Sequence, residues 1–399
     1  MASNSALLTR RNIVLLGALQ IVTWGGSFFL MSVLAGPLMH ETGWSHERVM
    51  AAVSIALAVA AMASPACGRI IAAGRGRELI ASSGPLIAVG LWIVAGTSHL
   101  GMFYLGWVVI GFGIAAGLYD SLFSTLGSVF GPSARGTITG VTLISGFASA
   151  IIWPLLAWAF SLWGWRLTCG VYGLLLIATA PLYLRALPRA PARTLLATAE
   201  ISRAAAEMDR TTYVWMTLSF AIAAGLMTAV SVALIELLQA NGMSLASAIA
   251  LSAVIGPAQV VFRIIDMLGR RRHPLTTALM ASGATAAGLL LLAIAPAWAF
   301  VALVFYGAGN GMRAIVKSTL PLSFVRGEAY ARVTSRMARP MFMAQAIAPI
   351  VTGYLMGSAG AKGTAAVLCS LGLIAVGATV ALMLRVRKNP GLMLAPAAT

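Results

Sequence analysis

Runs of apolar residues long enough to cross a membrane recur along almost the whole chain. A spanning helix takes about 20 mostly apolar residues. Charges and Gly/Pro turns divide the sequence into twelve such runs, at residues 13–36, 47–72, 79–97, 102–128, 136–161, 166–185, 212–239, 245–268, 275–295, 298–322, 332–357 and 363–385. Only 9% of the 399 residues are charged, against about 25% in ordinary soluble domains. This pattern excludes a soluble enzyme, a disulfide-linked secreted domain and a disordered chain.

Helix-length runs predict the fold class directly. Backbone in lipid must satisfy its own hydrogen bonds, so we predict an all-α membrane protein with twelve transmembrane helices. A polar connection separates six spans from six. The predicted domains are an N-terminal six-helix bundle at 1–186, a cytoplasmic central loop at 187–211 and a C-terminal six-helix bundle at 212–399.

The net charge of +17 comes from 27 Lys and Arg against 10 Asp and Glu. With the N-terminus in the cytoplasm, nearly all of the loop cations fall on the cytoplasmic side, and only Arg48, Arg166 and Lys362 fall on the other. This bias predicts two cytoplasmic termini. It also accounts for the charge without a nucleic-acid partner. We expect a monomer in a bilayer of the bacterial inner-membrane type.

Short motifs repeat between the two halves. The pairs are Arg69-Ile70-Ile71 with Arg263-Ile264-Ile265, Gly111-x-Gly113 with Gly307-x-Gly309, and Ala134-Arg135-x-Thr137 with Ala331-Arg332-x-Thr334. Three matches in order, at offsets of 194, 196 and 197, predict a duplicated six-helix unit and hence two pseudo-symmetric bundles. Internal repeats of this kind are typical of alternating-access transporters.

At these positions the chain resembles the major facilitator superfamily of secondary transporters. The family signature after the second helix is a Gly, an Asp four residues on, then Gly-Arg-Arg. The second-half copy keeps the Asp and has Phe262 in place of the first Gly, whereas the first-half copy has Ala72 in place of the Asp. The resemblance implies a conformational or gating role for Gly68, Arg69, Arg75, Asp266, Gly269 and Arg270.

Other segments are similar to bacterial monocarboxylate transporters and oxalate/formate antiporters. These segments are Gly43-Trp44-Ser45, Ser64-Pro65 with Gly68-Arg69, Arg135-Gly136 and Gly164-Trp165-Arg166. Two departures qualify the resemblance. Trp107 stands where members often carry an Arg, and the Gly-Pro-x-x-Gly-Gly pattern of drug/proton antiporters is absent.

Ionisable side chains within predicted spans are costly and indicate function. Arg313 lies roughly 5 Å from the bilayer centre at ~1.5 Å of rise per residue. Spacings of four, three and four place Tyr306, Asn310, Arg313 and Lys317 on one face of a helix. A second such face contains Gln259, Arg263 and Asp266, and a further cation is Arg339 beside Pro340. The alternative for Arg313 is a buried arginine paired with backbone carbonyls between helices. The candidate substrate-binding residues are Arg313, Arg263, Arg339, Lys317, Asn310, Tyr306, Gln259 and Tyr119.

Two carboxylates lie within spans. Asp120 is a candidate proton carrier because burial raises the pKa of an unpaired carboxyl; a fixed ion pair with an Arg is the alternative. Glu236, near the outer end of its span, is a second candidate for proton coupling, with a solvated or gating role as the alternative.

The charge inside the spans indicates the sign of the substrate. The spans contain four cationic side chains and only two acidic ones; they are Arg263, Arg313, Lys317 and Arg339, and Asp120 and Glu236. Arginine binds carboxylates through two parallel hydrogen bonds. We therefore expect a proton-coupled or exchange carrier for a small organic anion of the carboxylate type. The alternatives are proton-driven efflux of drug-like compounds and a membrane sensor that transports nothing. No catalytic motif occurs, and no cofactor or metal is expected.

Overall fold

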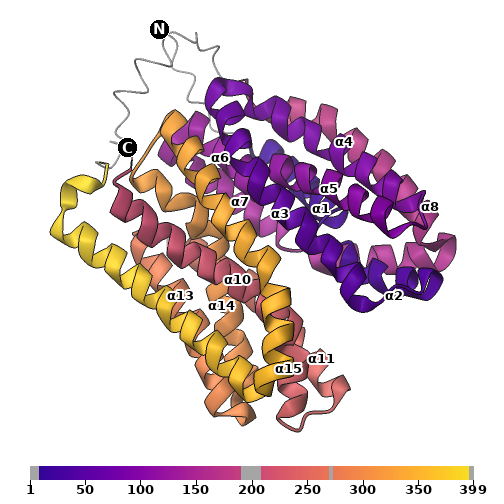
Figure 1. Cartoon of the computed structure of the whole chain (residues 1–399). Helices are drawn as coiled ribbons and strands as arrows, with labels where there is room; N and C mark the ends of the chain where they lie inside the picture. The colour runs from indigo at the N-terminus through magenta and orange to yellow at the C-terminus, as the bar shows by residue number, and fades with distance from the viewer. Residues whose placement is uncertain (1–8, 190–207, 269–272, 395–399) are drawn as a thin grey trace. The chain divides into compact units, whose positions relative to one another are not determined.

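The computed structural model describes residues 9–189, 208–268 and 273–394, and the regular elements in these ranges are helices. The chain divides into two compact units. Figure 1 shows the chain coloured by residue number, from indigo at the N-terminus to yellow at the C-terminus. Unit 1 comprises Met1–Ala206 and Val325–Arg339, and unit 2 comprises Glu207–Phe324 and Pro340–Thr399.

Each unit is a bundle of helices. Those of unit 1 are α1 (Arg10–Gly25), α2 (Met31–Thr42), α3 (His46–Ile70), α4 (Gly76–Ala95), α5 (Leu100–Gly117), α6 (Tyr119–Phe130), α7 (Ala134–Ser145) and α8 (Ala148–Ala186). Those of unit 2 are α10 (Arg210–Ala240), α11 (Leu245–Ser252), α12 (Ile255–Leu268), α13 (Pro274–Ile294) and α14 (Ala299–Thr319). The last helix, α15 (Gly327–Lys388), begins in unit 1 and continues in unit 2.

Two of these helices, α8 and α15, each contain two passes of the chain, and α3 and α4 are joined by a short helical segment at Ile71–Arg75. Among the described residues, seven helices are long and apolar enough to cross a membrane. The chain leaves helical geometry at Gly74, Gly164 and Gly360, with φ of 82°, 71° and 65°. Glycine adopts this left-handed backbone without a Cβ clash, so each break lets the chain turn back. The prediction of an all-helical bundle is confirmed, and these breaks are consistent with twelve passes.

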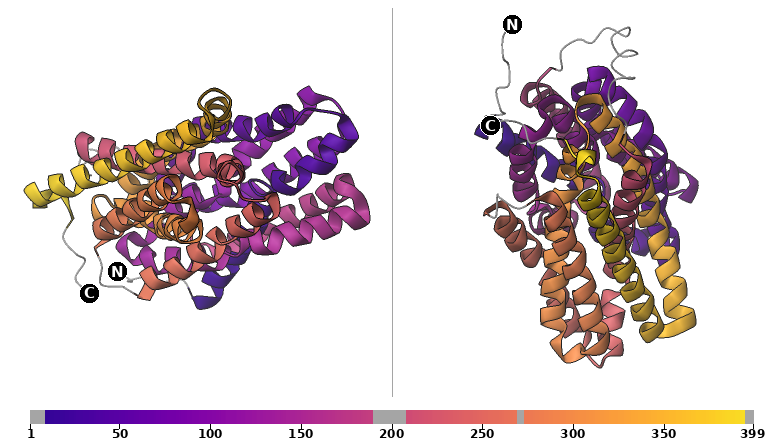
Figure 2. Two further views of the ribbon diagram at one scale, coloured as in Figure 1. Left: turned by 90° about the horizontal axis from the view of Figure 1, so that it is seen from below. Right: turned by 90° about the vertical axis from the view of Figure 1, so that its left-hand side faces the viewer.

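Glycines let the helices of each unit approach closely. In unit 1, α4 packs between α5 and α8. Gly90 and Gly106 face each other where α4 crosses α5, and a Cβ on either would lie under 3 Å from the carbonyl oxygen of the other. In unit 2, α13 and α14 lie side by side (Figure 2). Gly311 of α14 rests against the backbone of Gln259 in α12. Small residues at such crossings allow dense packing where lipid supplies no hydrophobic drive.

Three spans predicted as continuous are interrupted in unit 1. The run 13–36 divides between α1 and α2 after the pair Gly25-Gly26, and the run 136–161 divides at Gly146. The run 102–128 divides at Leu118, whose backbone is extended (φ −75°, ψ −177°). Side chains replace the lost backbone bonds. Gln20 Nε2 donates to the Gly117 carbonyl at 2.7 Å.

The first turns of α15 pack within unit 1 against α3 and α6. Thr334 Oγ1 donates to Ser124 Oγ at 3.0 Å. A Cβ at Gly68 would overlap the Ser335 side chain, and one at Gly127 would overlap the Tyr330 ring. The absence of a side chain at these two glycines therefore allows α15 to dock.

We predict that Gly311→Ala destabilises the protein whereas Gly283→Ala does not. A Cβ at Gly311 would meet the carbonyl oxygen of Gln259, while one at Gly283 would meet nothing within 4 Å. Replacing Gly by Ala raises helix propensity by about 1 kcal/mol at both positions. The difference between the two variants therefore isolates the effect of the clash, which we expect to lower the free energy of unfolding by about 1–3 kcal/mol. Thermal unfolding of both variants in detergent measures the difference. Equal melting temperatures would contradict this account of the crossing.

Candidate functional site

Arg313 projects from α14 onto the backbone of α10. Its Nη1 donates to the Ala223 carbonyl oxygen of α10, and its Nη2 donates to Asn310 Oδ1 at 2.5 Å. The side chain is half-buried. Both of these acceptors are neutral, so they hold the guanidinium in place without cancelling its charge.

Asn310 and Tyr306 hold this arrangement from the same face of α14. Asn310 Nδ2 donates to the Tyr306 carbonyl at 3.1 Å, and the Tyr306 hydroxyl donates to the Leu226 carbonyl of α10 at 3.3 Å. Both side chains are buried. The predicted face of α14 thus exists, and two of its members orient Arg313.

Gln259 and Arg263 of α12 lie next to this face because α12 crosses α14 at Gly311. Arg263 is buried, and its Nη2 donates to Gln259 Oε1 at 3.5 Å. The guanidinium groups of Arg263 and Arg313 are close enough to repel each other electrostatically. Two cations from neighbouring helices of unit 2 therefore influence each other electrostatically.

Of the remaining candidate residues, Lys317 lies on the same helix as Arg313, whereas Arg339 and Glu236 lie on other helices. Lys317 is half-buried one turn beyond Arg313 on α14. Arg339 is exposed on the part of α15 that belongs to unit 1, so it is not in the same unit as Arg313. Glu236 is exposed near the end of α10.

Tyr119 and Asp120 open α6 directly after the break at Leu118. The Tyr119 hydroxyl shares a hydrogen bond of 2.6 Å with Ser145 Oγ of α7. Asp120 is half-buried and interacts electrostatically with Tyr330 of α15. The predicted carboxylate of the first half therefore faces the docked start of α15.

The predicted gating residues fall into three groups. Gly68 is buried against α15, and Asp266 is buried and accepts a hydrogen bond from Thr277 Oγ1 at 3.2 Å. Arg69 and Arg75 are exposed at the end of α3 and beyond it. Gly269 and Arg270 lie outside the described residues.

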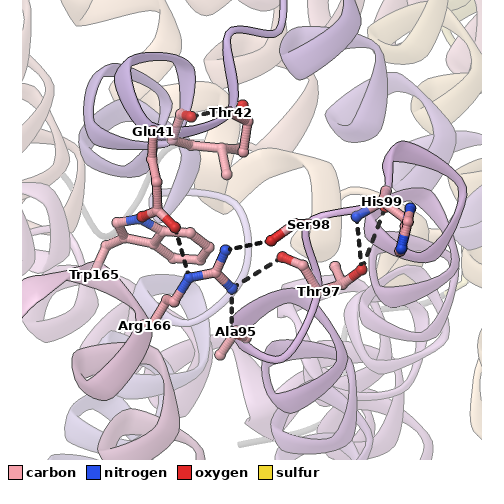
Figure 3. Close-up of polar contacts among 9 residues, drawn as sticks. Glu41, Thr42, Ala95, Thr97, Ser98, His99, Trp165 and Arg166 are labelled. Carbon is pink, nitrogen blue, oxygen red and sulfur yellow. Dashed lines mark hydrogen bonds and ion pairs between the residues drawn. The ribbon is translucent and has the colours of Figure 1, made fainter.

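A cluster at one end of unit 1 was not predicted. The Glu41 carboxylate accepts from Arg166 Nε at 2.9 Å and from Trp165 Nε1 at 2.6 Å. Figure 3 shows the Arg166 guanidinium extending to the turn after α4, where Nη1 donates to the carbonyls of Ala95 (2.6 Å) and Thr97 (2.9 Å). This cluster joins the ends of α2 and α4 to the break at Gly164. Its residues are far apart in sequence, so only the Gly164-Trp165-Arg166 motif pointed to it.

Comparisons with known proteins agree on one family. The family model for the Major Facilitator Superfamily matches residues 16–338. No curated protein matches the chain.

Solved structures with the same fold include transporters of that superfamily. One is FucP in the outward conformation, with a TM-score of 0.69 and 16% identity over 92% of this chain and 98% of FucP; the E. coli protein is described as a fucose:proton symporter. Another is the human organic anion transporter MFSD10 (TETRAN), with a TM-score of 0.71 and 14% identity over 94% of this chain and all of that one. At such identities the similarity shows the fold alone.

We predict that Glu41 stabilises unit 1 in a pH-dependent way. Hydrogen bonds from Arg166 and Trp165 hold the pKa of Glu41 below its ordinary value of 4.5. A carboxyl with a lowered pKa in the folded state stabilises the fold above its unfolded pKa, and the effect is lost as the pH falls through the folded pKa. Glu41→Gln is expected to lose about 1 kcal/mol or less at neutral pH, the range of exposed ion pairs.

Melting temperatures of wild type and Glu41→Gln between neutral pH and pH ~3.5 test this prediction, with Glu78→Gln as the control because Glu78 is exposed at the start of α4. The gap between wild type and Glu41→Gln should narrow on acidification below about 4.5. A gap that stays constant across this range would exclude the Glu41 carboxylate as its source.

Proposed function

The chain belongs to the Major Facilitator Superfamily, and we propose that it carries a small organic anion, of the carboxylate type, across the membrane. The family consists of membrane transporters that work by alternating access, and the chain is a multi-pass membrane protein of this kind. Our proposal goes beyond membership of the family in three respects: the class of substrate, the coupling of transport to protons, and the subtype of carrier.

The proposal rests on the environment of the Arg313 guanidinium and on the groups to which it donates hydrogen bonds. Its guanidinium lies within a bundle of apolar helices and donates to a carbonyl and to an amide oxygen, both neutral. Desolvating a charge without a counter-ion is expensive, so a bound carboxylate would lower the energy of this site. Arginine binds carboxylates through paired hydrogen bonds.

Arg263 strengthens the argument. It is buried on α12 near Arg313, and the two positive charges repel. An anion within reach of both would relieve that repulsion as well as gain its own attraction. Gln259 and Asn310 would orient it, and Lys317 would add a further positive charge along the same face of α14.

The sequence motifs suggest a monocarboxylate or oxalate/formate type of carrier as the subtype. MFSD10, a structure with the same fold, is described as an organic anion transporter. At 14% identity, the similarity to MFSD10 does not assign a role to any individual residue of this chain.

Coupling and placement complete the proposal. We assign proton coupling to Asp120, with Glu236 as a secondary candidate at the end of α10, and a role near the substrate to Arg339 and Tyr119. A cytoplasmic loop at 187–211 connects the two proposed six-helix domains, at 1–186 and 212–399; most of this loop lies outside the described residues. The protein acts as a monomer in a bacterial-type inner membrane with both termini in the cytoplasm.

A second candidate function is proton-driven efflux of drug-like compounds. It is favoured by one observation, the group of aromatic rings in unit 1 around Trp24, Tyr119 and Trp153. Efflux of neutral or cationic compounds would not depend on Arg313. A sensor that binds ligand without transporting it would show binding in detergent and no flux in liposomes.

We predict that Arg313→Gln weakens binding of carboxylates by about 10- to 100-fold. This range corresponds to losing a charge-assisted interaction of about 1.5–3 kcal/mol. Gln retains a donor for the Ala223 carbonyl, and Arg313→Lys retains the charge, so the lysine variant should bind better than the glutamine variant. A thermal-shift screen of mono-, di- and aromatic carboxylates, followed by titration calorimetry, measures the affinities.

Arg10→Gln is the matched control, because Arg10 is exposed at the start of α1 and its loss removes the same formal charge. Carboxylate affinities that are the same in wild type, Arg313→Gln and Arg10→Gln would refute the assigned role of Arg313.

We predict that Asp120→Asn abolishes the dependence of transport on the proton gradient while leaving exchange of substrate across the membrane intact. An amide cannot take up and release the coupled proton. Uptake into proteoliposomes with and without a pH gradient measures the effect, and Glu78→Gln serves as a control acid in unit 1. Gradient-driven uptake by Asp120→Asn at the wild-type level would rule out coupling through this residue.

A further inference from the structure

Three passes of unit 1 are interrupted near the middle of their predicted spans. The breaks lie at Gly26–Leu30 between α1 and α2, at Leu118 between α5 and α6, and at Gly146–Phe147 between α7 and α8. Irregular backbone at membrane depth occurs where it is buried in protein or lines a cavity. Interrupted helices of this kind commonly form the binding sites of transporters.

Aromatic rings from these three passes meet at the breaks. The Trp24 ring lies 5.0 Å from Tyr119 and 5.4 Å from Phe29, measured between centroids, and Phe29 lies 5.8 Å from Trp153. Phe28 lies 5.5 Å from Trp24. We call these five residues the aromatic cluster. The rings of Trp24, Phe28, Phe29 and Tyr119 are only half-buried, and Trp153 is 42% exposed, so the cluster retains ring surface for a ligand.

Two polar atoms of α1 beside the cluster have no hydrogen-bond partner among the described residues. They are Gln20 Oε1, an acceptor, and Trp24 Nε1–H, a donor. Gln20 and Trp24 are four residues apart and so share a face of α1. Gln20 is 0% exposed. Its amide nitrogen donates to the Gly117 carbonyl at 2.7 Å and to the Tyr183 hydroxyl at 3.1 Å, which fixes the orientation of the amide and leaves Oε1 without a donor.

Buried polar atoms nearly always find a partner, so one that lacks it indicates a missing group. A hydroxyl group has the chemistry that each of these atoms lacks, because it can donate to Gln20 Oε1 and accept from Trp24 Nε1–H. A sugar or another polyol fits less well, since each further hydroxyl would need its own partner among aromatic rings. Stacked and edge-on ring contacts favour a flat, apolar body.

We propose that the aromatic cluster of unit 1 binds an aromatic ring of the transported molecule, and that this ring carries a hydroxyl group. The inference rests on the proposed function only for the negative charge of the substrate. The ring stacks on Trp24 and Tyr119, and the hydroxyl bonds to Gln20 and Trp24.

The test compares ligands that differ by one group, on the purified full-length protein. Titration calorimetry with 4-hydroxybenzoate, benzoate, cyclohexanecarboxylate, acetate and uncharged phenol gives the affinities. Wild type should bind 4-hydroxybenzoate about tenfold more tightly than benzoate, and benzoate more tightly than the non-aromatic acids. Tenfold corresponds to one good hydrogen bond.

The decisive variant is Trp24→Phe, which keeps a ring and removes the N–H donor. It should lower the ratio of 4-hydroxybenzoate to benzoate affinity, because the hydroxyl then keeps only its bond to Gln20, while the affinity for benzoate itself changes little. Comparing two ligands within one variant cancels any loss of folded protein. Trp163→Phe is the control, because Trp163 is half exposed on α8, and its ratio should equal that of wild type.

The outcomes separate the two proposals. If carboxylates bind in an Arg313-dependent way but Trp24→Phe leaves the affinity ratio unchanged, the aromatic-site inference is overturned and the proposed function stands. If phenol binds in a Trp24-dependent way and no carboxylate binds more tightly, the ring site stands and the anion proposal fails. Absence of binding for all five ligands overturns the inference.

Discussion

The need to satisfy backbone hydrogen bonds without water governs this structure. An unbroken helix meets the need by itself, so each interruption requires a substitute. At the break after α5, Gln20 supplies it for the Gly117 carbonyl, and Ser121 Oγ donates across the break to the Ala115 carbonyl at 2.5 Å. The same amide that bonds to the interrupted backbone has an oxygen, Oε1, that is buried and has no hydrogen-bond partner among the described residues, and we propose that a ligand hydroxyl fills this position. Structural repair and recognition are thus combined in one side chain of α1.

The second constraint is the cost of charge within apolar helices. In unit 2, hydrogen bonds to neutral acceptors offset part of the desolvation energy of the Arg313 guanidinium. Arg313 is fixed by a carbonyl and an amide, and Arg263 lies near enough to repel it. A bound anion near Arg313 would lower the electrostatic energy of this arrangement, which is the basis of the proposed function. In unit 1 the polar atoms of α1 that have no partner among the described residues, Gln20 Oε1 and Trp24 Nε1–H, are neutral.

The sequence was sufficient for the fold class and for the face of α14, because hydrophobic run length and helical periodicity are local properties. It also indicated that Gln259 and Arg263 share a face, and the glycines of α14 explain why that face meets Arg313. The helix breaks could not be predicted, since Leu118 is an ordinary apolar residue and its extended backbone is imposed by tertiary contacts. The pairing of Glu41 with Arg166 spans 125 positions, and nothing in either segment alone selects the partner.

The contact between Glu41 and Arg166 also bears on how such a chain enters a membrane. In the proposed orientation Arg166 is one of three cations on the outer side, where a potential that is negative inside pulls positive charge inward by about 2.3 kcal/mol per charge for each 100 mV. The Glu41 carboxylate forms an ion pair with Arg166 at 2.9 Å. In this orientation the pair carries no net charge, so the membrane potential exerts no net pull on it, whereas Arg166 alone would be drawn inward.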